Sequence, residues 1–300
     1  MVLGPPVPGP PGGLRDPDGM ILTYREGHGF MVNPVATTGR WRGLNDEQSP
    51  EQLAEPLLQM AVRRGGGDTS LVWEYYDVAA EPDAMRPGVS GMAQARLAEL
   101  LSTAYRRTGR RAFAEDAALA LEGLALPVDG GGATSMVRLE GWDAARPWYV
   151  ERAYPGEDPW TGAALNGFMV TLLSLRNAGN RLSQGPGGSV AVTTGTTADA
   201  APPPDPVALR AADLARRLAD RGALTLRAAL PAHDLGDWSL YGILTRGRPR
   251  GTYRADLNYH CYHVFLLRAL ARTYPDLGFA QTADRWQGYV DERGLECPVR

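Results

Sequence analysis

The chain has 300 residues, of which 44% are hydrophobic and 22% are charged, a composition typical of a globular protein with a buried core. Its net charge of −3 argues against nucleic-acid binding, which usually requires a marked basic excess. No segment reaches the ~18 consecutive apolar residues of a membrane span, and no secretory signal pattern opens the chain, so we expect a cytoplasmic protein without membrane or nucleic-acid partners.

The N-terminal third is predicted to contain a leader, short strands and one helix. Residues 1–18 form a Pro- and Gly-rich tract that we expect to be disordered. Residues 20–35 alternate between polar and apolar side chains, which predicts one or two strands. A helix is expected from Pro50, where leucines recur at helical spacing, and residues 71–76 have the composition of a further strand.

From residue 90 onward the pattern becomes helical and paired. Apolar side chains recur with helical periodicity in six segments, namely 93–107, 111–124, 164–177, 205–220, 259–273 and 277–290. Extended segments are expected at 130–139 and 148–154. Successive helical hairpins predict a mainly α protein, built as an incomplete or full α/α toroid with a few short strands at its mouth. We expect residues 19–300 to form a single domain.

The segment 183–205 interrupts this pattern with Gly, Thr, Ala and Pro residues. Such a low-complexity composition predicts a flexible insertion. A surface loop is the simpler interpretation, and a lid is the alternative.

The chain has two cysteines, Cys261 and Cys297. Two cysteines are too few for a disulfide framework. We expect free thiols in a reducing compartment, with a single bridge as the alternative.

Short motifs in the C-terminal two-thirds of the chain follow the order found in one enzyme family. They are, in chain order, Gly91-Met92-Ala93-Gln94, Thr108-Gly109, Trp148-Tyr149 with Tyr154-Pro155, Leu165-Asn166-Gly167-Phe168, Trp238-Ser239-Leu240-Tyr241, Tyr259-His260 with His263, and Arg285-Trp286 with Tyr289. Each motif alone is weak evidence, whereas their shared order is much more specific. By these motifs the chain resembles the helical catalytic domain of the D-glucuronyl C5-epimerase family.

The resemblance implies a reaction that needs no metal and no other cofactor. The family inverts C5 of glucuronate units in heparosan-type chains, giving iduronate, by removing the C5 proton and returning it on the opposite face. This chemistry requires acid/base groups across the sugar plane and donors that stabilise an enolate-like intermediate. The expected partner is a small-molecule or oligosaccharide substrate with a carboxylate or carbonyl, and a homodimer is compatible with the sequence.

Three tyrosines match the tyrosines of the family's active site. We expect Tyr259 to be one acid/base residue, with Tyr154 as its partner or as the enolate-stabilising donor and Tyr241 in support. A phenol, with a pKa of ~10, is suited to returning a proton. Asn166 matches a substrate-facing asparagine at a helix start, where an amide and the helix N-terminus can hold a carboxylate. The alternative for any one tyrosine is a half-buried packing role.

The sequence departs from the family pattern at two positions. The family motif has a glutamate, regarded as the second catalytic base, directly before the first tyrosine, where this chain has Ala153. Glu151 would point to the same face as Ala153 on a strand, and it is therefore the candidate replacement. The arginine that follows the second tyrosine motif is also missing, and Arg246 is the nearest substitute.

The remaining candidates for substrate binding are Gln94, His260, His263 and Arg246. The two histidines lie one helical turn apart, as metal ligands can. No third ligand accompanies them and the resemblance implies none, so no metal site is expected. Packing or hydrogen bonding to the tyrosines is the simpler role, and general acid/base catalysis is a further option.

The missing glutamate leaves two other functions open. A pocket with one enolate stabiliser and proton donor would suit a natural-product tailoring enzyme, acting by dehydration or Michael-type cyclisation on a small-molecule or peptide intermediate. A non-catalytic carbohydrate-binding protein is an alternative from a different class. The missing glutamate favours that alternative, and the three retained tyrosines oppose it.

Overall fold

The computed structural model describes most of the chain, with gaps. The described residues are 14–25, 29–40, 49–66, 69–77, 86–158, 160–187, 203–244 and 251–298. Most of the predicted leader, the centre of the predicted insertion and Arg246 lie outside them. Leu14–Arg15, at the end of the predicted leader, form a short strand.

The described N-terminal part consists of short antiparallel strands and two helices. A three-stranded sheet contains β1 (Leu14–Arg15), β2 (Ile21–Arg25) and β3 (Gly29–Val32), and two hairpins pair β4 (Val62–Arg64) with β5 (Ser70–Val72) and β6 (Glu74–Asp77) with β7 (Arg86–Val89). The helices are α1 (Pro34–Arg40) and α2 (Pro50–Gln59). Ser49 begins α2 with a capping box, since its side chain accepts from the Gln52 N–H and the Gln52 side chain accepts from the Ser49 N–H.

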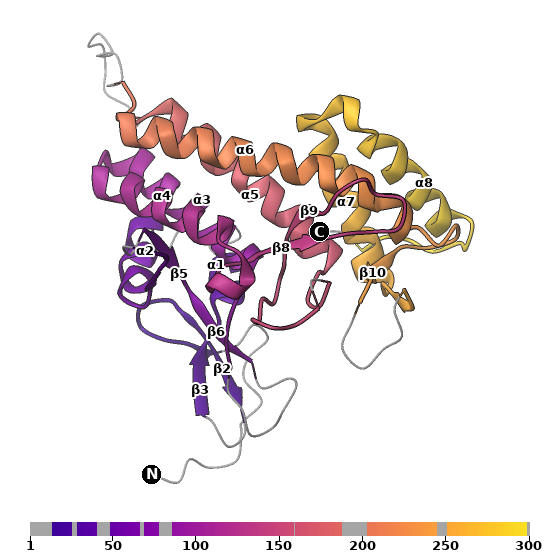
Figure 1. The fold of residues 1–300 in the computed structure, drawn as a ribbon, viewed down its shortest axis with the longest axis horizontal. Coiled ribbons are helices and arrows are strands. Elements are labelled where there is room, and N and C mark those ends of the chain that lie inside the picture. Colours follow the sequence, from indigo (N-terminus) through magenta and orange to yellow (C-terminus); the bar gives the residue numbers. More distant parts are fainter. Residues whose placement is uncertain are drawn as a thin grey trace.

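Four long helices form the centre of the molecule (Figure 1). They are α3 (Gly91–Thr108), α4 (Arg111–Ala125), α5 (Leu165–Gln184) and α6 (Pro206–Ala229). Helix α3 packs against α4 and α5, and α6 packs against both of these. Ser90 caps α3, and Gly109 ends it in the left-handed conformation with φ 68°, as the Thr108-Gly109 motif predicts.

Glycine allows the two longest helices to approach closely. A Cβ atom at Gly222 of α6 would lie 2.4 Å from Leu172 Cδ2 of α5, so a larger residue would push the helices apart. A buried ion pair joins α3 to α5, because Arg181 Nη1 lies 2.6 Å from Glu99 Oε1, which also accepts from Asn177 at 2.9 Å.

The C-terminal part adds a helical pair and two further hairpins. Helices α7 (Leu257–Thr273) and α8 (Phe279–Asp291) pack together, and α7 also packs on α5. Strand β8 (Thr134–Val137) pairs with β9 (Arg146–Tyr149), and β10 (Leu240–Gly242) with β11 (Tyr253–Arg254). Three 3₁₀ turns complete the described elements, η1 (Val128–Gly130), η2 (Leu230–His233) and η3 (Pro275–Leu277).

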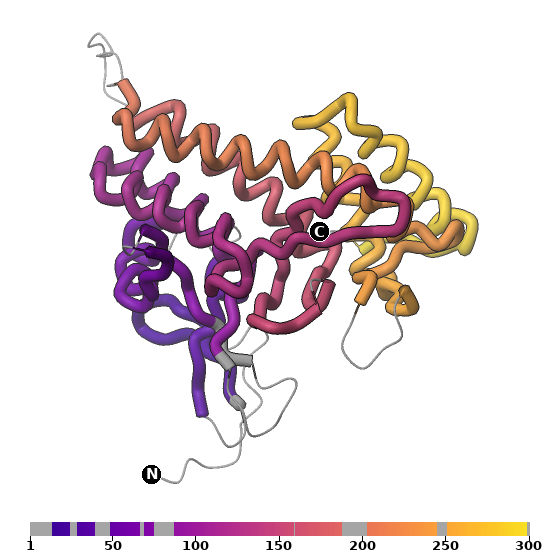
Figure 2. Tube along the Cα trace, viewed as in Figure 1, coloured from indigo at the N-terminus to yellow at the C-terminus, as the bar shows by residue number. Residues whose placement is uncertain are grey.

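The prediction of a mainly α fold with a few short strands is confirmed. The described residues contain eight α-helices, and their strands form small separate sheets without a barrel. Helices α2 and α4 lie at one end and α7 and α8 at the other, so the array is open (Figure 2). Among the described helices, none combines the length and apolar character needed to cross a bilayer.

The expectation of two free thiols is wrong. Cys261 in α7 and Cys297 after α8 form a disulfide, with their Cα atoms 5.5 Å apart. The count of two cysteines gives no measure of spatial distance, and the fold of α7 against α8 returns the chain to Cys261. The bridge fixes the C-terminal segment to the helix that carries Tyr259.

Candidate functional site

Glu151 occupies a partly buried position beside the first turn of α5. It follows β9, and its N–H donates to the Gly162 carbonyl at 2.9 Å. A Cβ atom at Gly167 would lie 3.1 Å from Glu151 Oε2, so glycine makes room for the carboxylate beside the first turn of the helix. The N-terminus of a helix favours negative charge. Burial raises the pKa of Glu151, while the charges of Arg152 and Arg96 and a hydrogen bond with Tyr241 oppose this rise.

Tyr241 connects Glu151 to the second tyrosine of the cluster. Its phenol hydrogen-bonds with Glu151 and with Tyr259. The Tyr241 ring lies edge-on to that of Tyr259, with centroids 4.8 Å apart, and 5.0 Å from that of Tyr253. Burial, followed by the negative charge of Glu151, raises the pKa of Tyr241 well above its ordinary value. The phenol is therefore protonated at neutral pH and acts as a hydrogen-bond donor.

Tyr259 is the solvent-exposed end of the cluster. It lies in the first turn of α7, where its N–H donates to Asp256 Oδ1 at 2.8 Å, so Asp256 caps the helix that carries it. The residue is 37% exposed, and a substrate can reach its phenol more readily than the Glu151 carboxylate. Burial and the charge of Glu151 raise the pKa of Tyr259.

Tyr154 lies on the side of the β6–β7 hairpin. A Cβ atom at Gly88 of β7 would lie 2.7 Å from Tyr154 Cε1, so the ring rests directly on the strand at a position that only glycine permits. The adjacent Ala153 exchanges backbone hydrogen bonds with Val89 at 2.9 and 3.2 Å. The residue that replaces the family's glutamate is thus buried against β7, whereas Glu151 is linked to the other tyrosines.

Asn166 presents an unsatisfied acceptor close to Glu151. It is the second residue of α5 and is 6% exposed. No group of the described residues donates to its buried Oδ1 atom. An unpaired buried carbonyl costs free energy, so a donor such as a substrate hydroxyl would be favourable there.

Gln94 is occupied by backbone contacts, in contrast to its predicted role in substrate binding. Its Nε2 donates to the carbonyls of Leu71 at 2.6 Å and Ala120 at 2.9 Å, and its Oε1 lies 3.4 Å from the Trp73 N–H. The side chain is 1% exposed. These contacts join β5 and α4 to α3, which is a structural role.

His260 and His263 were also expected to bind substrate, and the structure places both in the protein interior. Ser239 Oγ lies 2.8 Å from His260 Nδ1 and 2.9 Å from His263 Nδ1. His260 Nε2 lies 2.9 Å from the Trp286 carbonyl, so this nitrogen carries the proton. Both rings are fully buried, and these contacts fix α7 against β10 and α8.

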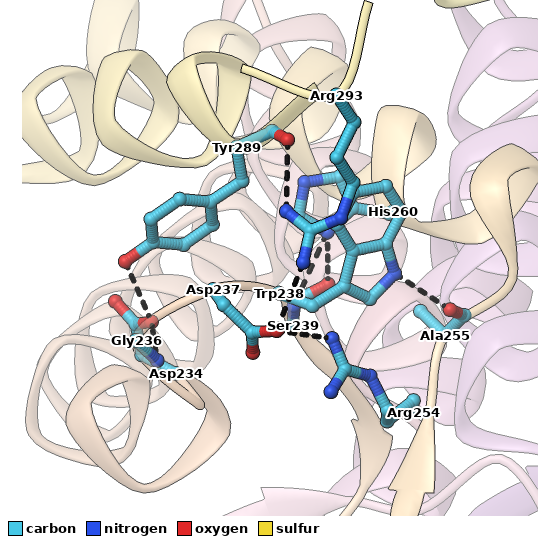
Figure 3. A network of polar contacts seen from close by, with 10 residues as sticks. All are labelled: Asp234, Gly236, Asp237, Trp238, Ser239, Arg254, Ala255, His260, Tyr289 and Arg293. Carbon is cyan, nitrogen blue, oxygen red and sulfur yellow. Dashed lines mark hydrogen bonds and ion pairs between the residues drawn. The ribbon is translucent and has the colours of Figure 1, made fainter. Parts of the chain in front are cut away.

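A polar network surrounds His260 (Figure 3). Asp237 accepts from Arg254 and Arg293, each at 2.9 Å. The Trp238 ring stacks on His260 with centroids 3.9 Å apart, and its indole N–H donates to the Ala255 carbonyl at 2.7 Å. The network joins the segment before β10 to β11, α7 and the end of α8, and it thereby fixes the elements that carry Tyr241 and Tyr259.

Four residues near the site were missed by the sequence analysis. Arg96 and Arg152 act on the Glu151 charge, Tyr253 contacts Tyr241, and Tyr262 lies near Arg96. Arg96 belongs to α3 and follows the Gly91 motif closely. Its closeness to this motif was the only sequence signal that could have identified Arg96. Helical spacing alone does not show which tertiary contacts a side chain makes.

A separate cavity lies at the other end of the long helices. It has a volume of about 480 Å³ and is lined in part by Tyr105, Arg107, Arg111 and Asp205. Both arginines are paired, Arg107 with Glu51 at 3.3 Å and Arg111 with Glu115 at 2.8 Å. The cavity therefore offers no unbalanced positive charge to an anionic ligand.

Comparisons with known proteins agree on one family. Residues 67–288 match the family described as "D-glucuronyl C5-epimerase C-terminus". A curated relative, D-glucuronyl C5-epimerase from Caenorhabditis elegans, is 33% identical over 76 residues, which are 25% of this chain. The matched part spans 12% of the length of that relative.

Proposed function

The chain belongs to the D-glucuronyl C5-epimerase C-terminal family, and from this premise we propose that it moves a proton at a carbon next to a carboxylate. The proposed substrate is a glucuronate or iduronate unit in a small molecule or oligosaccharide. The observation that carries the proposal is the hydrogen-bonded chain Glu151–Tyr241–Tyr259, which runs from a partly buried carboxylate to an exposed tyrosine.

In the proposed mechanism, this chain acts as a relay in which Glu151 is the final base. A phenol has a single O–H group, so with Glu151 ionised Tyr241 donates to it and Tyr259 donates to the Tyr241 oxygen. As the C–H bond breaks, its proton moves to the Tyr259 oxygen. The Tyr259 proton moves to Tyr241, and the Tyr241 proton moves to Glu151.

The relay explains how two phenols with raised pKa values can pass a proton to the base, Glu151. Neither tyrosine has to become a free phenolate, because each loses one proton as it gains another. The raised pKa of Glu151 brings the final acceptor closer to neutral pH, where a general base is most effective. The electron pair of the broken bond forms an enolate, which hydrogen-bond donors stabilise.

For epimerisation, a second group must return the proton on the opposite face. The hydroxyls of Tyr241 and Tyr259 are hydrogen-bonded to each other, so a sugar ring does not fit between them. We therefore assign both tyrosines to the same face of the sugar. Tyr154 is the proposed proton donor of the other face, and Asn166 Oδ1 the acceptor for a substrate hydroxyl. Release of the proton from Glu151 to solvent and reprotonation of Tyr154 from solvent together close the cycle.

Deuterium exchange tests the proposed function. The wild-type protein, incubated with heparosan in deuterated water, is expected to incorporate deuterium at C5 and to form iduronate, both measured by NMR. Glu151→Gln should reduce exchange by roughly 10²–10⁴-fold. Folded wild-type protein that exchanges no C5 deuterium in heparosan or in its shorter oligosaccharides would contradict the proposal.

A second candidate function is one-sided chemistry on a natural-product intermediate, by dehydration or Michael-type cyclisation. One observation favours it, namely that Glu151, Tyr241 and Tyr259 form one continuous group on a single face. Elimination and addition use the same enolate, and they require no proton return across a ring. Product stereochemistry separates the two candidates, because deuterium exchange at C5 with no iduronate indicates one-sided protonation.

A further inference from the structure

Arg96 is a partly buried arginine near the proposed base. It belongs to α3, whose first residue, Gly91, donates its N–H to the carbonyl of Val150 at 2.8 Å. Val150 directly precedes Glu151, so the start of α3 and the carboxylate segment are joined. On its other side, the Arg96 guanidinium reaches α1, with Nη1 3.4 Å from the Val35 carbonyl. A Cβ atom at Gly39 would lie 3.1 Å from the same nitrogen.

The contacts of Arg96 do not satisfy its guanidinium. Its Nε–H is buried and has no hydrogen-bond acceptor among the described residues. Within the same residues, no carboxylate forms an ion pair with it, whereas Arg181 of α5 pairs with Glu99 at 2.6 Å. A buried donor without an acceptor is costly, and guanidinium groups bind carboxylates with paired, charge-assisted hydrogen bonds.

Arg96 is close enough to Glu151 for the two charges to interact. Burial lowers the pKa of Arg96, and the negative charge of Glu151 opposes this change. Glu151 itself is engaged by Tyr241 and by the first turn of α5. The unsatisfied Arg96 Nε–H is a donor and the unsatisfied Asn166 Oδ1 is an acceptor, and both residues belong to helices whose first turns contact the segment 150–151.

We infer that Arg96 binds the carboxylate of the substrate. This inference rests on the proposed function and names the residue that selects a uronate over a neutral sugar. In the proposed reaction, the negative charge that develops at the carbon is shared with this carboxylate. A cation held against it therefore stabilises the enolate more than the ground state. The missing arginine after Tyr241 is, in this view, replaced from α3.

A pair of small glycosides tests the inference without requiring turnover. Methyl β-D-glucuronide and methyl β-D-glucoside differ only in having a carboxylate or a hydroxymethyl group, and their affinities can be measured by NMR titration. The wild-type protein should prefer the glucuronide. Arg96→Gln should reduce this preference on the order of tenfold, and Arg96→Lys, which keeps the charge, should retain part of it.

The controls separate this inference from loss of folding and from the proposed function. Arg272→Gln, at an exposed position of α7, changes the net charge equally and should keep the wild-type preference. Circular dichroism and thermal melting check that each variant is folded. A folded Arg96→Gln variant with the full preference would overturn the role of Arg96 alone. A wild-type protein with no preference for the glucuronide would overturn both this role and the proposed substrate class.

Discussion

At the residue scale, the proposed mechanism depends on how burial changes the pKa values of three acidic groups. A carboxylate in water has a pKa of ~4.3 and a phenol ~10. The fold raises the pKa values of Glu151, Tyr241 and Tyr259, in each case first through burial. The carboxyl becomes a better base, and the phenols remain protonated. This combination favours a relay over a free phenolate.

The pH dependence of activity should reflect Glu151. The relay requires an ionised carboxylate, so activity should fall as the pH falls through the folded-state pKa of Glu151, at a higher pH than for an ordinary glutamate. In Glu151→Gln this acidic limb should be absent from the residual activity. Rates of C5 exchange measured across the acidic range check the prediction, and an unchanged limb in the variant would assign it to another group.

Glu151 should also affect the stability of the fold. Because the folded-state pKa of Glu151 is raised, the folded protein binds this proton more tightly than the unfolded chain. The carboxyl therefore favours folding below the unfolded-state pKa, and this contribution is lost as the pH rises through the folded-state value. Glu151→Gln should raise the Tm at neutral pH, with a smaller gain near pH 4. Thermal melts at both pH values measure the difference.

Tyr259 and Tyr274 offer a matched pair of phenols at opposite ends of α7. Tyr259→Phe removes the exposed end of the relay and should reduce exchange by about 10²–10⁴-fold. Tyr274→Phe removes a phenol that donates to Asp220 at 2.9 Å and should leave exchange near the wild-type rate. Equal rates of exchange in the two variants would show that Tyr259 takes no part in the proton transfer.

At the scale of elements, the close contact of β7 with Tyr154 is a sensitive point. Gly88→Ala would place a Cβ atom 2.7 Å from the Tyr154 ring, so the ring must shift. A misplacement of about 1 Å in a catalytic group can cost ~10²-fold in rate. Gly288→Ala is the control, since a Cβ atom there meets no atom within 4 Å. The rates of C5 exchange in the two variants test whether Tyr154 must keep its position.

The disulfide is a second feature at this scale. It closes a loop with a sequence separation of 36 residues, and removing such a bridge typically costs roughly 2–4 kcal/mol. Cys297→Ser should therefore lower the denaturant midpoint, and a reductant should destabilise the wild type but not the variant. Equal midpoints for the wild type with and without reductant would show that the bridge adds no stability.

Helix positions were largely predictable from the sequence, whereas helix ends were not. Seven helical segments were predicted, one from Pro50 and six after residue 90, and each corresponds to an observed helix. The segment expected at 205–220 continues to Ala229, because Gly222 serves as a contact with Leu172 and does not end the helix. The short helix α1 was missed, since its 7 residues are too few to show a period.

At the scale of the whole molecule, the site unites segments that are far apart in the sequence. Tyr241 and Tyr259 were predicted from motifs, and Glu151 was predicted as the replacement for the missing glutamate. Their contacts with one another follow from the packing of α5, β10 and α7. Gln94, His260 and His263 also belong to these motifs, but their hydrogen bonds are structural. Gln94 donates to a backbone carbonyl, and the two histidines hydrogen-bond with Ser239. A motif marks positions that the fold constrains, and it does not distinguish structural from chemical constraints.

The buried pair between Glu99 and Arg181 should be important for the stability of the helical array. Glu99→Ala leaves Arg181 without its partner at the α3–α5 interface, and breaking a buried pair typically costs about 3–5 kcal/mol. The double variant with Arg181→Leu should recover part of this loss, because no uncompensated charge remains. Urea unfolding of the single and double variants measures the recovery, which would be absent if the cost arose from packing alone.

Helix α5 runs from the candidate site at its N-terminus to the low-complexity segment that follows its C-terminus. The helix begins beside Asn166 and ends at Gln184, and its 20 residues span about 30 Å. A foreign peptide spliced between Gly187 and Pro203 would therefore be anchored far from the tyrosines. An affinity tag inserted at this place would allow the protein to be immobilised on a sensor surface with the candidate site facing the solution. A fluorescent reporter could be inserted in the same way.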